Sequence, residues 1–207
     1  MSTPTPSPTL RAVSGLPEEP ARLADAALVL IDVQNTYREG VMALTDVEEA
    51  VKATAELLGA ARAAGIPVVH VVNDAGEGTP YDIRTRIGAI SDEVAPIDGE
   101  PVVVKNYPNA FHATTLTETL TGLGFAPGAD KELVLAGFMT HMCVQFTAQG
   151  AFNLGYRPTV VADATATRAL PAPDGTVVPA AALQTAALTT IADLFGVVVP
   201  TTGALRA

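Results

Sequence analysis

The sequence predicts an α/β fold, with a single domain in which a six-stranded parallel sheet lies between two layers of helices (α/β/α). Short runs rich in β-branched residues or leucine alternate with alanine-rich segments of helical period, which is the pattern of repeated βα units. A length of 207 residues is enough for one domain with a sizeable core. The expected strands are Ala27–Ile31, Pro67–Val72, Pro101–Val104, Leu133–Ala136, Thr159–Val161 and Val197–Val199.

Four helices are expected between these strands. Segment 47–64 has apolar residues at helical spacing, with Asp46 as the expected N-terminal cap and Gly65 as the residue that ends it. The other three helices are expected at about Thr114–Leu123, Cys143–Leu154 and Pro179–Leu194. Residues 73–100 hold several glycines and prolines and predict a long connection, which at this length is typically functional.

The first 24 residues differ in composition from the rest of the chain. They carry five prolines among serines and threonines, a composition that does not keep a helix and offers little apolar surface to bury. We expect an extended or disordered arm at residues 1–24 and the folded domain at residues 25–207.

Charge and composition exclude several classes of partner. The net charge of −10, without a cluster of Lys or Arg, argues against nucleic acid. The apolar fraction is 48%, yet no uninterrupted stretch reaches the roughly 20 residues that a membrane-spanning helix needs. The one cysteine cannot form an internal disulfide, and the start has neither the basic nor the apolar part of a secretory signal. The cytoplasm is therefore the expected location.

The single cysteine, Cys143, stands where a predicted buried strand is followed by a helix. A helix that begins near Cys143 directs free N–H groups and the positive end of its dipole at the sulfur. Both effects lower the pKa of a thiol and leave donors for an oxyanion. The sequence thus predicts a reactive thiolate at this position.

Two further polar residues follow predicted strands. Asp32 comes directly after the first strand and Lys105 directly after the third. Because the carboxyl ends of parallel strands share one edge, where ligands bind, we expect both residues to lie close to Cys143. Alone, Cys143 is typical of a small buried residue, Asp32 of a helix cap and Lys105 of a solvated strand end; the combination favours catalysis.

The motifs that carry these residues resemble the isochorismatase-like cysteine hydrolases, a superfamily that includes nicotinamidases and N-carbamoylsarcosine amidase. The first motif is Leu30-Ile31-Asp32-Val33-Gln34-Asn35, and the second is Val104-Lys105 followed by Asn109-Ala110-Phe111. The third runs from Gly137 through Thr140, Cys143-Val144 and Thr147-Ala148 to Gly155-Tyr156. The resemblance spans about residues 27–162 and implies a Rossmann-like topology.

The resemblance implies a catalytic triad of Asp32, Lys105 and Cys143. In this role Asp32 exchanges protons, Lys105 stabilises the thiolate, and Cys143 attacks an amide-like carbonyl to form a thioester. The backbone N–H groups of Met139 and Cys143 are the implied oxyanion hole, with a cis peptide bond between Phe138 and Met139. The implied activity is hydrolysis of a non-peptide carbon–nitrogen bond in a small molecule, without an organic cofactor.

Other residues near the motifs have two interpretations each. By analogy Gln34 lines the substrate pocket, although a role in the turn after the strand fits as well. Tyr107, Phe111, Phe138 and Met139 form an apolar pocket wall or belong to the core. His141 either donates to substrate or caps the turn before Cys143, and His112 is expected at the surface.

The sequence departs from the nicotinamidase pattern after the second strand. The metal-binding histidines expected there are missing, and His70, Asp74 and Glu77 are expected to be a core or interface histidine and two loop carboxylates. We therefore expect no catalytic metal.

Two alternatives to this function remain open. One is isochorismate-type hydrolysis of a vinyl ether, in which the cysteine has no nucleophilic role, and another is a catalytically silent binding protein. Streptothricin lactam is a further candidate substrate. Because members of the superfamily are commonly dimers or tetramers, the resemblance also implies a homo-oligomer.

Overall fold

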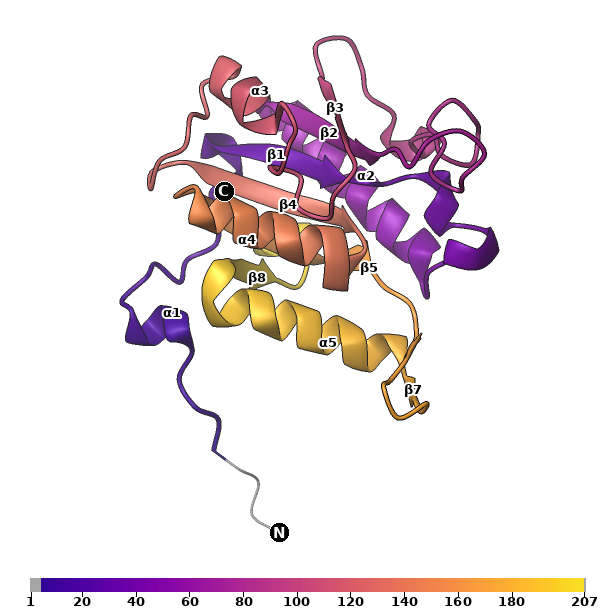
Figure 1. The fold of residues 1–207 in the computed structure, drawn as a ribbon. Coiled ribbons are helices and arrows are strands. Elements are labelled where there is room, and N and C mark those ends of the chain that lie inside the picture. The colour runs from indigo at the N-terminus through magenta and orange to yellow at the C-terminus, as the bar shows by residue number, and fades with distance from the viewer. Residues whose placement is uncertain (1–4, 207) are drawn as a thin grey trace.

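A computed structural model describes residues 5–206 and shows the predicted six-stranded, all-parallel sheet (Figure 1). The strand order is β3-β2-β1-β4-β5-β8, which places β1 and β4 at the centre. The strands are β1 Ala26–Ile31, β2 Val68–Asn73, β3 Val102–Lys105, β4 Glu132–Phe138, β5 Arg157–Ala166 and β8 Val197–Val199. A separate two-stranded hairpin, β6 Leu170–Pro171 with β7 Val177–Val178, was not predicted.

The helices lie on both faces of the sheet, as the α/β/α prediction requires (Figure 1). They are α2 Val47–Ala64, α3 Leu116–Gly122, α4 Gln145–Asn153 and α5 Ala180–Thr190. A π-helical turn, Thr140–Val144, precedes α4, and a second one, Ile191–Phe195, continues α5.

The predicted end of α2 is confirmed, but the predicted cap at its start is wrong. Gly65 has φ +67° and ends the helix in the left-handed conformation, as expected. Asp46 also has a positive φ, +54°, and its side chain makes no capping hydrogen bond, because a side-chain cap requires an extended backbone. Glu48 and Glu49 place negative charge in the first turn instead, which suits the helix dipole.

The sheet separates two apolar cores. Side chains alternate along a strand, so Leu28 and Leu30 of β1 pack on the side of α2 while Val29 and Ile31 pack on the side of α3 and α4. Every residue of β1 and β4 is buried. The continuous apolar runs in the sequence are explained by this burial on both faces.

The two central strands approach closely where the polar residues follow. Gly137 in β4 has φ +120°, and a Cβ atom there would lie 1.9 Å from the carbonyl oxygen of Ile31. Only glycine fits this contact, which holds the end of β4 against the end of β1.

Part of the N-terminal segment is folded, so the prediction of an extended arm is wrong for residues from Leu10 onward. Leu10–Val13 form the short helix α1, where the guanidinium of Arg11 donates to the carbonyl of Leu194. Further along, the amide of Ala21 donates to the hydroxyl of Thr159. Residues 1–4 of the expected arm lie outside the described residues. Within residues 5–206, no helix has the length and apolar character needed to cross a bilayer.

Candidate active site

The three strand-end residues predicted to meet do lie together. Nζ of Lys105 is 2.7 Å from Oδ2 of Asp32 and donates to Sγ of Cys143 at 3.2 Å. The exposed fractions are 0% for Asp32, 1% for Lys105 and 8% for Cys143. The ammonium therefore bridges a carboxylate and a thiol inside the protein, where charges are strongly coupled because water is excluded.

Each of the three residues is positioned by a different element. Asp32 follows β1 with φ +51°, an uncommon conformation for a residue other than glycine, and its amide donates to Val71. Lys105 is the last residue of β3 and alternates inward with Val103. Cys143 lies in the π-helical turn before α4. The helix was predicted to begin at Cys143, but the helical turns begin at Thr140.

The expected lowering of the thiol pKa is wrong for this state of the site. Burial, followed by the charge of Asp32, raises the pKa of Cys143 to about 12, and Lys105 only partly opposes them. Burial also raises the pKa of Asp32, against the opposing influence of Lys105. Burial alone would lower the pKa of Lys105, but the negative partners outweigh it and raise that pKa. The resting site therefore holds a protonated thiol beside an unusually basic carboxylate.

The backbone before Cys143 offers a hydrogen-bond donor. The Phe138–Met139 peptide bond is cis, as the resemblance implied. The carbonyl of Met139 accepts from the amides of Met142 and Val144, whereas within residues 5–206 the amide of Met139 donates to no protein group. This N–H is available to a substrate oxygen.

Gln34 is used to hold the connection between β2 and β3. Its side-chain nitrogen donates to the carbonyls of Asn73, at 3.0 Å, and Gly88, at 2.6 Å, and its side-chain oxygen accepts from the amide of Asn73 at 2.9 Å. Gln34 is fully buried. Of its two predicted roles, the structural one after the strand fits these contacts.

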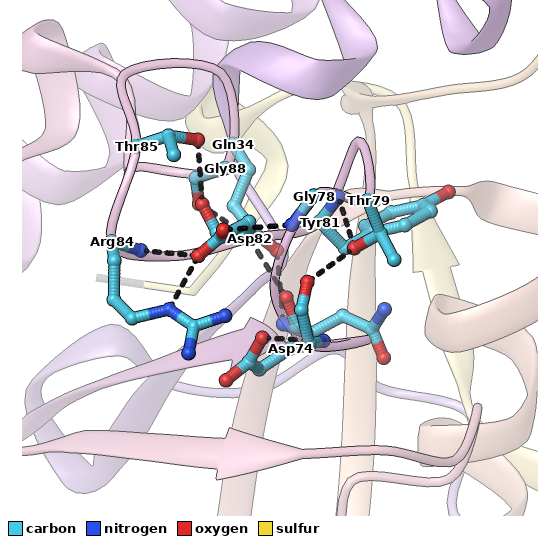
Figure 2. A network of polar contacts seen from close by, with 11 residues as sticks. Gln34, Asp74, Gly78, Thr79, Tyr81, Asp82, Arg84, Thr85 and Gly88 are labelled. Carbon is cyan, nitrogen blue, oxygen red and sulfur yellow. Dashed lines mark hydrogen bonds and ion pairs between the residues drawn. The ribbon is translucent and has the colours of Figure 1, made fainter.

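The connection that Gln34 holds is itself organised around Asp82 (Figure 2). The Asp82 carboxylate accepts from the amides of Gly78 and Arg84 and pairs with the Arg84 guanidinium at 2.6 Å. A Cβ atom on Gly88 would lie 2.2 Å from the carbonyl oxygen of Asp82, so the chain crosses itself closely here. These contacts fix the backbone on both sides of Tyr81.

Tyr81 and Tyr37 belong to the site and were missed from the sequence. Tyr37 lies edge to face with both Phe138 and Tyr81, with ring centroids 5.8 Å apart in each pair. The two phenol groups are close enough for each to influence the pKa of the other. Burial, and then the charges of Asp32 and Cys143, raise the pKa of Tyr37, so its hydroxyl stays protonated. Phe138 is fully buried and belongs to the core on the side of α2, so the core interpretation fits it.

Two of the aromatic residues proposed for the pocket wall lie elsewhere. Tyr107 is 53% exposed and its ring lies edge to face with His112. Phe111 stacks on Tyr156 with centroids 5.7 Å apart, on the core side of α3 and α4. The core interpretation therefore fits Phe111, and a surface position fits Tyr107 and His112.

His141 lies beside a second group of residues that the sequence did not single out. Its Nδ1 is 2.5 Å from the hydroxyl oxygen of Thr167. Burial, and then the charge of Arg168, lower the pKa of His141. The imidazole is therefore neutral at pH 7. Thr167 and Arg168 directly follow β5 and could have been found by the same strand-end rule as the triad. They were missed because the strand was predicted to end at Val161, five residues before its end at Ala166.

His70 has the core position expected of it. Its Nε2 lies 2.9 Å from Oε2 of Glu100, which also pairs with Arg62. Asp74 accepts from the amide of Gly76 within its own loop. Within residues 5–206, no three His, Cys, Asp or Glu side chains are grouped closely enough to hold a metal ion.

Comparisons with known proteins agree with the fold and the motifs. The sequence model of the isochorismatase domain matches residues 26–202. An isochorismatase from Pseudomonas putida, solved by crystallography, is 39% identical with a TM-score of 0.89, covering 97% of this chain and 100% of that one. A secreted isochorismatase effector of Verticillium dahliae is 37% identical, covering 92% of this chain and 96% of the relative. Streptothricin hydrolase of Streptomyces noursei is 36% identical, covering 81% and 65% respectively.

A further relative is named for amide chemistry. The ureidoacrylate amidohydrolase of Stutzerimonas stutzeri is 31% identical, covering 72% of this chain and 75% of the relative. The fold and these relatives define the protein as a hydrolase with an α/β/α architecture. The chain belongs to the isochorismatase family, as its three motifs predicted.

Proposed function

We propose that this protein hydrolyses a non-peptide carbon–nitrogen bond, an amide or a lactam, in a small molecule through a thioester on Cys143. The observation that carries the proposal is the Lys105 ammonium held between Asp32 and Cys143 in a buried site. A nucleophile, a base and a fixed cation are the groups that acyl transfer needs.

In the first half of the reaction, the Cys143 thiol transfers its proton to Asp32 as the sulfur attacks the carbonyl carbon. The oxyanion that forms accepts hydrogen bonds from the amides of Met139 and Cys143. As the carbon–nitrogen bond breaks, Asp32 returns the proton to the departing nitrogen. The products of this half are an amine or ammonia and a thioester.

In the second half, water attacks the thioester carbon and gives a proton to Asp32. The carbon–sulfur bond breaks, the acid leaves, and the sulfur regains the proton. Lys105 remains protonated throughout and stabilises the negative charge that moves between the carboxylate and the sulfur. The raised pKa of Asp32 suits this role, because a carboxylate is a stronger base when burial disfavours its charge.

Gln34, Tyr37 and Phe138 have supporting roles in this proposal. Gln34 shapes the connection above the site through backbone contacts. Phe138 and Tyr37 are buried and pack edge to face, so they form an apolar layer near the triad. This layer excludes water and so strengthens the electrostatic interactions of the triad.

Hydrolysis of a vinyl ether is the second candidate, because a 37% identical relative is named an isochorismatase effector. In that reaction Cys143 forms no bond to the substrate. Retention of a thiol in contact with Lys105 favours the amide, since a vinyl-ether hydrolase has no use for it.

The test is an amide and lactam panel read by release of ammonia or amine, with isochorismate as a parallel substrate. We expect the Cys143→Ala variant to lose turnover of the amide and to be unable to form a covalent adduct visible by mass spectrometry. Full turnover by Cys143→Ala on the preferred substrate would eliminate the thioester. Turnover of isochorismate alone would favour the second candidate.

We also infer a homo-oligomer in a reducing compartment. Support for the oligomer comes from the exposed apolar side chains Val102 and Val104 on the edge strand β3. The reducing compartment suits a free, buried thiol used as a nucleophile. Sedimentation equilibrium tests the first inference, and fractionation of the source cells tests the second.

A further inference from the structure

One arginine differs from all the others in its contacts. The chain has nine arginines. Seven form ion pairs with Asp or Glu, and Arg11 donates to two backbone carbonyls. Within residues 5–206, Arg168 has neither an ion pair nor a hydrogen bond, and its Nε is buried without a partner. Buried polar groups are nearly always paired, so an unpaired buried guanidinium nitrogen calls for an explanation.

Arg168 lies beside the proposed active site. In the sheet, Ala166 at the end of β5 pairs with Phe138 at the end of β4. One residue after Ala166 and three residues after Phe138, the hydroxyl of Thr167 contacts Nδ1 of His141. Arg168 follows directly. It is therefore placed next to the turn that carries Cys143.

A second element, the connection between β2 and β3, also comes near Arg168. Tyr81, on the connection held by Asp82, lies within electrostatic reach of Cys143, Asp32 and Arg168. Tyr81 and His141 are thus both near enough for the charge of Arg168 to influence their pKa values. Both are neutral at pH 7, since the pKa of Tyr81 is raised by burial and that of His141 is lowered by burial and by Arg168. Of Tyr81, His141 and Arg168, only Arg168 carries a full charge at pH 7.

The positive charge of Arg168 is not balanced by the other groups of the site. Asp32 and Lys105 neutralise each other at 2.7 Å, and the thiol is uncharged in the resting state. The protein as a whole carries −10 and repels small anions. An unpaired guanidinium beside such a site has a planar set of donors that matches a carboxylate in two parallel hydrogen bonds.

We propose that Arg168 binds a carboxylate of the substrate, so that the enzyme acts on amides or lactams that carry an anionic group near the scissile bond. The inference that the bound anion is a substrate rests on the proposed function, whereas anion binding by Arg168 does not require turnover. Arg168 is assigned to binding and specificity, and the proton transfers remain with Asp32.

The first experiment compares charged and neutral amides of matched length by ammonia release. The probes are the half-amides oxamate, malonamate, succinamate and glutaramate, each against its neutral diamide. We expect the wild-type enzyme to favour at least one half-amide over its diamide by about 10- to 100-fold in kcat/KM, the range of a hydrogen bond to a charged group. Arg168→Met removes this preference by raising KM for the half-amide much more than for the diamide, and Arg168→Lys restores part of it.

The matched control is Arg86→Met. Arg86 pairs with Glu39 at the surface, so this variant also removes one positive charge from the protein. It keeps the preference for the half-amide. Equal loss in both variants would mean that long-range charge, and not binding by Arg168, sets the preference, and the proposal would be overturned.

The second experiment separates the anion site from catalysis. Calorimetry measures binding of the same half-amides to the Cys143→Ala variant, with and without Arg168→Met. We expect binding to weaken by about tenfold or more when Arg168 is replaced. If binding depends on Arg168 while no amide is hydrolysed by the wild type, the anion site stands and the proposed function falls. Binding that is absent, or unchanged by Arg168→Met, overturns the anion site.

Thermal unfolding excludes a structural explanation. Among the described residues Arg168 has no hydrogen bond or ion pair, so Arg168→Met breaks no polar contact and is expected to leave the unfolding temperature nearly unchanged. A clear drop in unfolding temperature, with the half-amide preference retained, would assign Arg168 to folding and contradict the proposal.

Discussion

Replacing Asp32 by Asn is expected to abolish hydrolysis and, at the same time, to make Cys143 more reactive toward alkylating agents. The resting thiol has a pKa of about 12, in part because the negative charge of Asp32 opposes a second negative charge on the sulfur. Asp32→Asn removes that charge but leaves Lys105 in place. The variant therefore favours the thiolate, but it lacks the carboxyl group that passes a proton to the departing nitrogen.

The size of the effect follows from the geometry. Asp32 Oδ2 and Cys143 Sγ both contact Lys105 Nζ, at 2.7 and 3.2 Å, so the two atoms are at most about 5.9 Å apart. Two unit charges at that distance interact by about 3 kcal/mol at an effective dielectric constant of 20. Removing this repulsion raises the thiolate fraction near pH 8 by about 100-fold.

The assay is the rate of iodoacetamide labelling of Cys143 between pH 6 and 10, followed by mass spectrometry of the intact protein. The wild type is expected to label slowly below pH 9, and Asp32→Asn about 100-fold faster at pH 8. Asp130→Asn is the control, since it removes the same charge from an exposed position paired only with Lys131. Labelling of Asp32→Asn at the wild-type rate, in a variant that unfolds at the wild-type temperature, would refute the argument.

Three other substitutions test the framework that holds the site. Gly137→Ala is expected to destabilise the protein by about 3 kcal/mol and to lower its unfolding temperature by about 6–12 °C, because the added Cβ would lie 1.9 Å from the Ile31 carbonyl oxygen. Calorimetry measures the unfolding temperature, and a near-normal value would contradict the close approach. Gln34→Ala leaves three backbone groups without side-chain partners and is expected to raise hydrogen exchange and proteolysis in residues 74–91, while unchanged protection there would contradict the proposed support. The pKa of Glu100 is lowered to about 2, first by its hydrogen bond with Arg62, so the carboxylate contributes about 3 kcal/mol of stability above pH 4.5 that is lost as the pH falls toward 2. In Glu100→Gln, the free energy of unfolding measured in urea is expected to depend less on pH in that window. An unchanged pH dependence would count against the pair.

The position of the triad could be predicted from the sequence because it depends on one strong rule. Asp32 follows β1, Lys105 is the last residue of β3, and the turn with Cys143 follows β4. The carboxyl ends of these parallel strands share one edge of the sheet. A change of one or two residues in a strand boundary does not alter this outcome. The prediction therefore held even though several boundaries moved.

Arg168 and Tyr81 could not be predicted because they depend on boundaries and loop contacts. β5 runs to Ala166, whereas the apolar run ends at Val161 and is followed by alternating small and polar residues. Those residues continue the strand because β4 supplies its hydrogen-bond partners, which is a tertiary effect. Tyr81 is placed by the carboxylate of Asp82 and by Gly88, and a glycine-rich segment gives no pattern from which such contacts follow.

The sequence argument about the thiol pKa was wrong for a related reason. It counted the helix N-terminus and the nearby ammonium, both of which favour a thiolate, but it did not include burial. In the structure Cys143 is 8% exposed and lies beside a carboxylate, and these two influences exceed the other two. Burial of a side chain follows from the packing of the whole fold, which local sequence around Cys143 does not reveal.

A protonated resting thiol is consistent with a cysteine nucleophile when the charges are followed through the first step. Before attack, Asp32 and Lys105 cancel and the sulfur is neutral; after proton transfer to Asp32, the developing negative charge on sulfur or oxyanion faces the same ammonium. The net charge of the cluster does not change, so the low dielectric of the interior imposes no additional cost on the transfer. A substrate anion held by Arg168 stays outside this cluster and is neutralised separately. The site is therefore unreactive toward small alkylating agents, yet it forms a thiolate when a carbonyl carbon is in position to receive it.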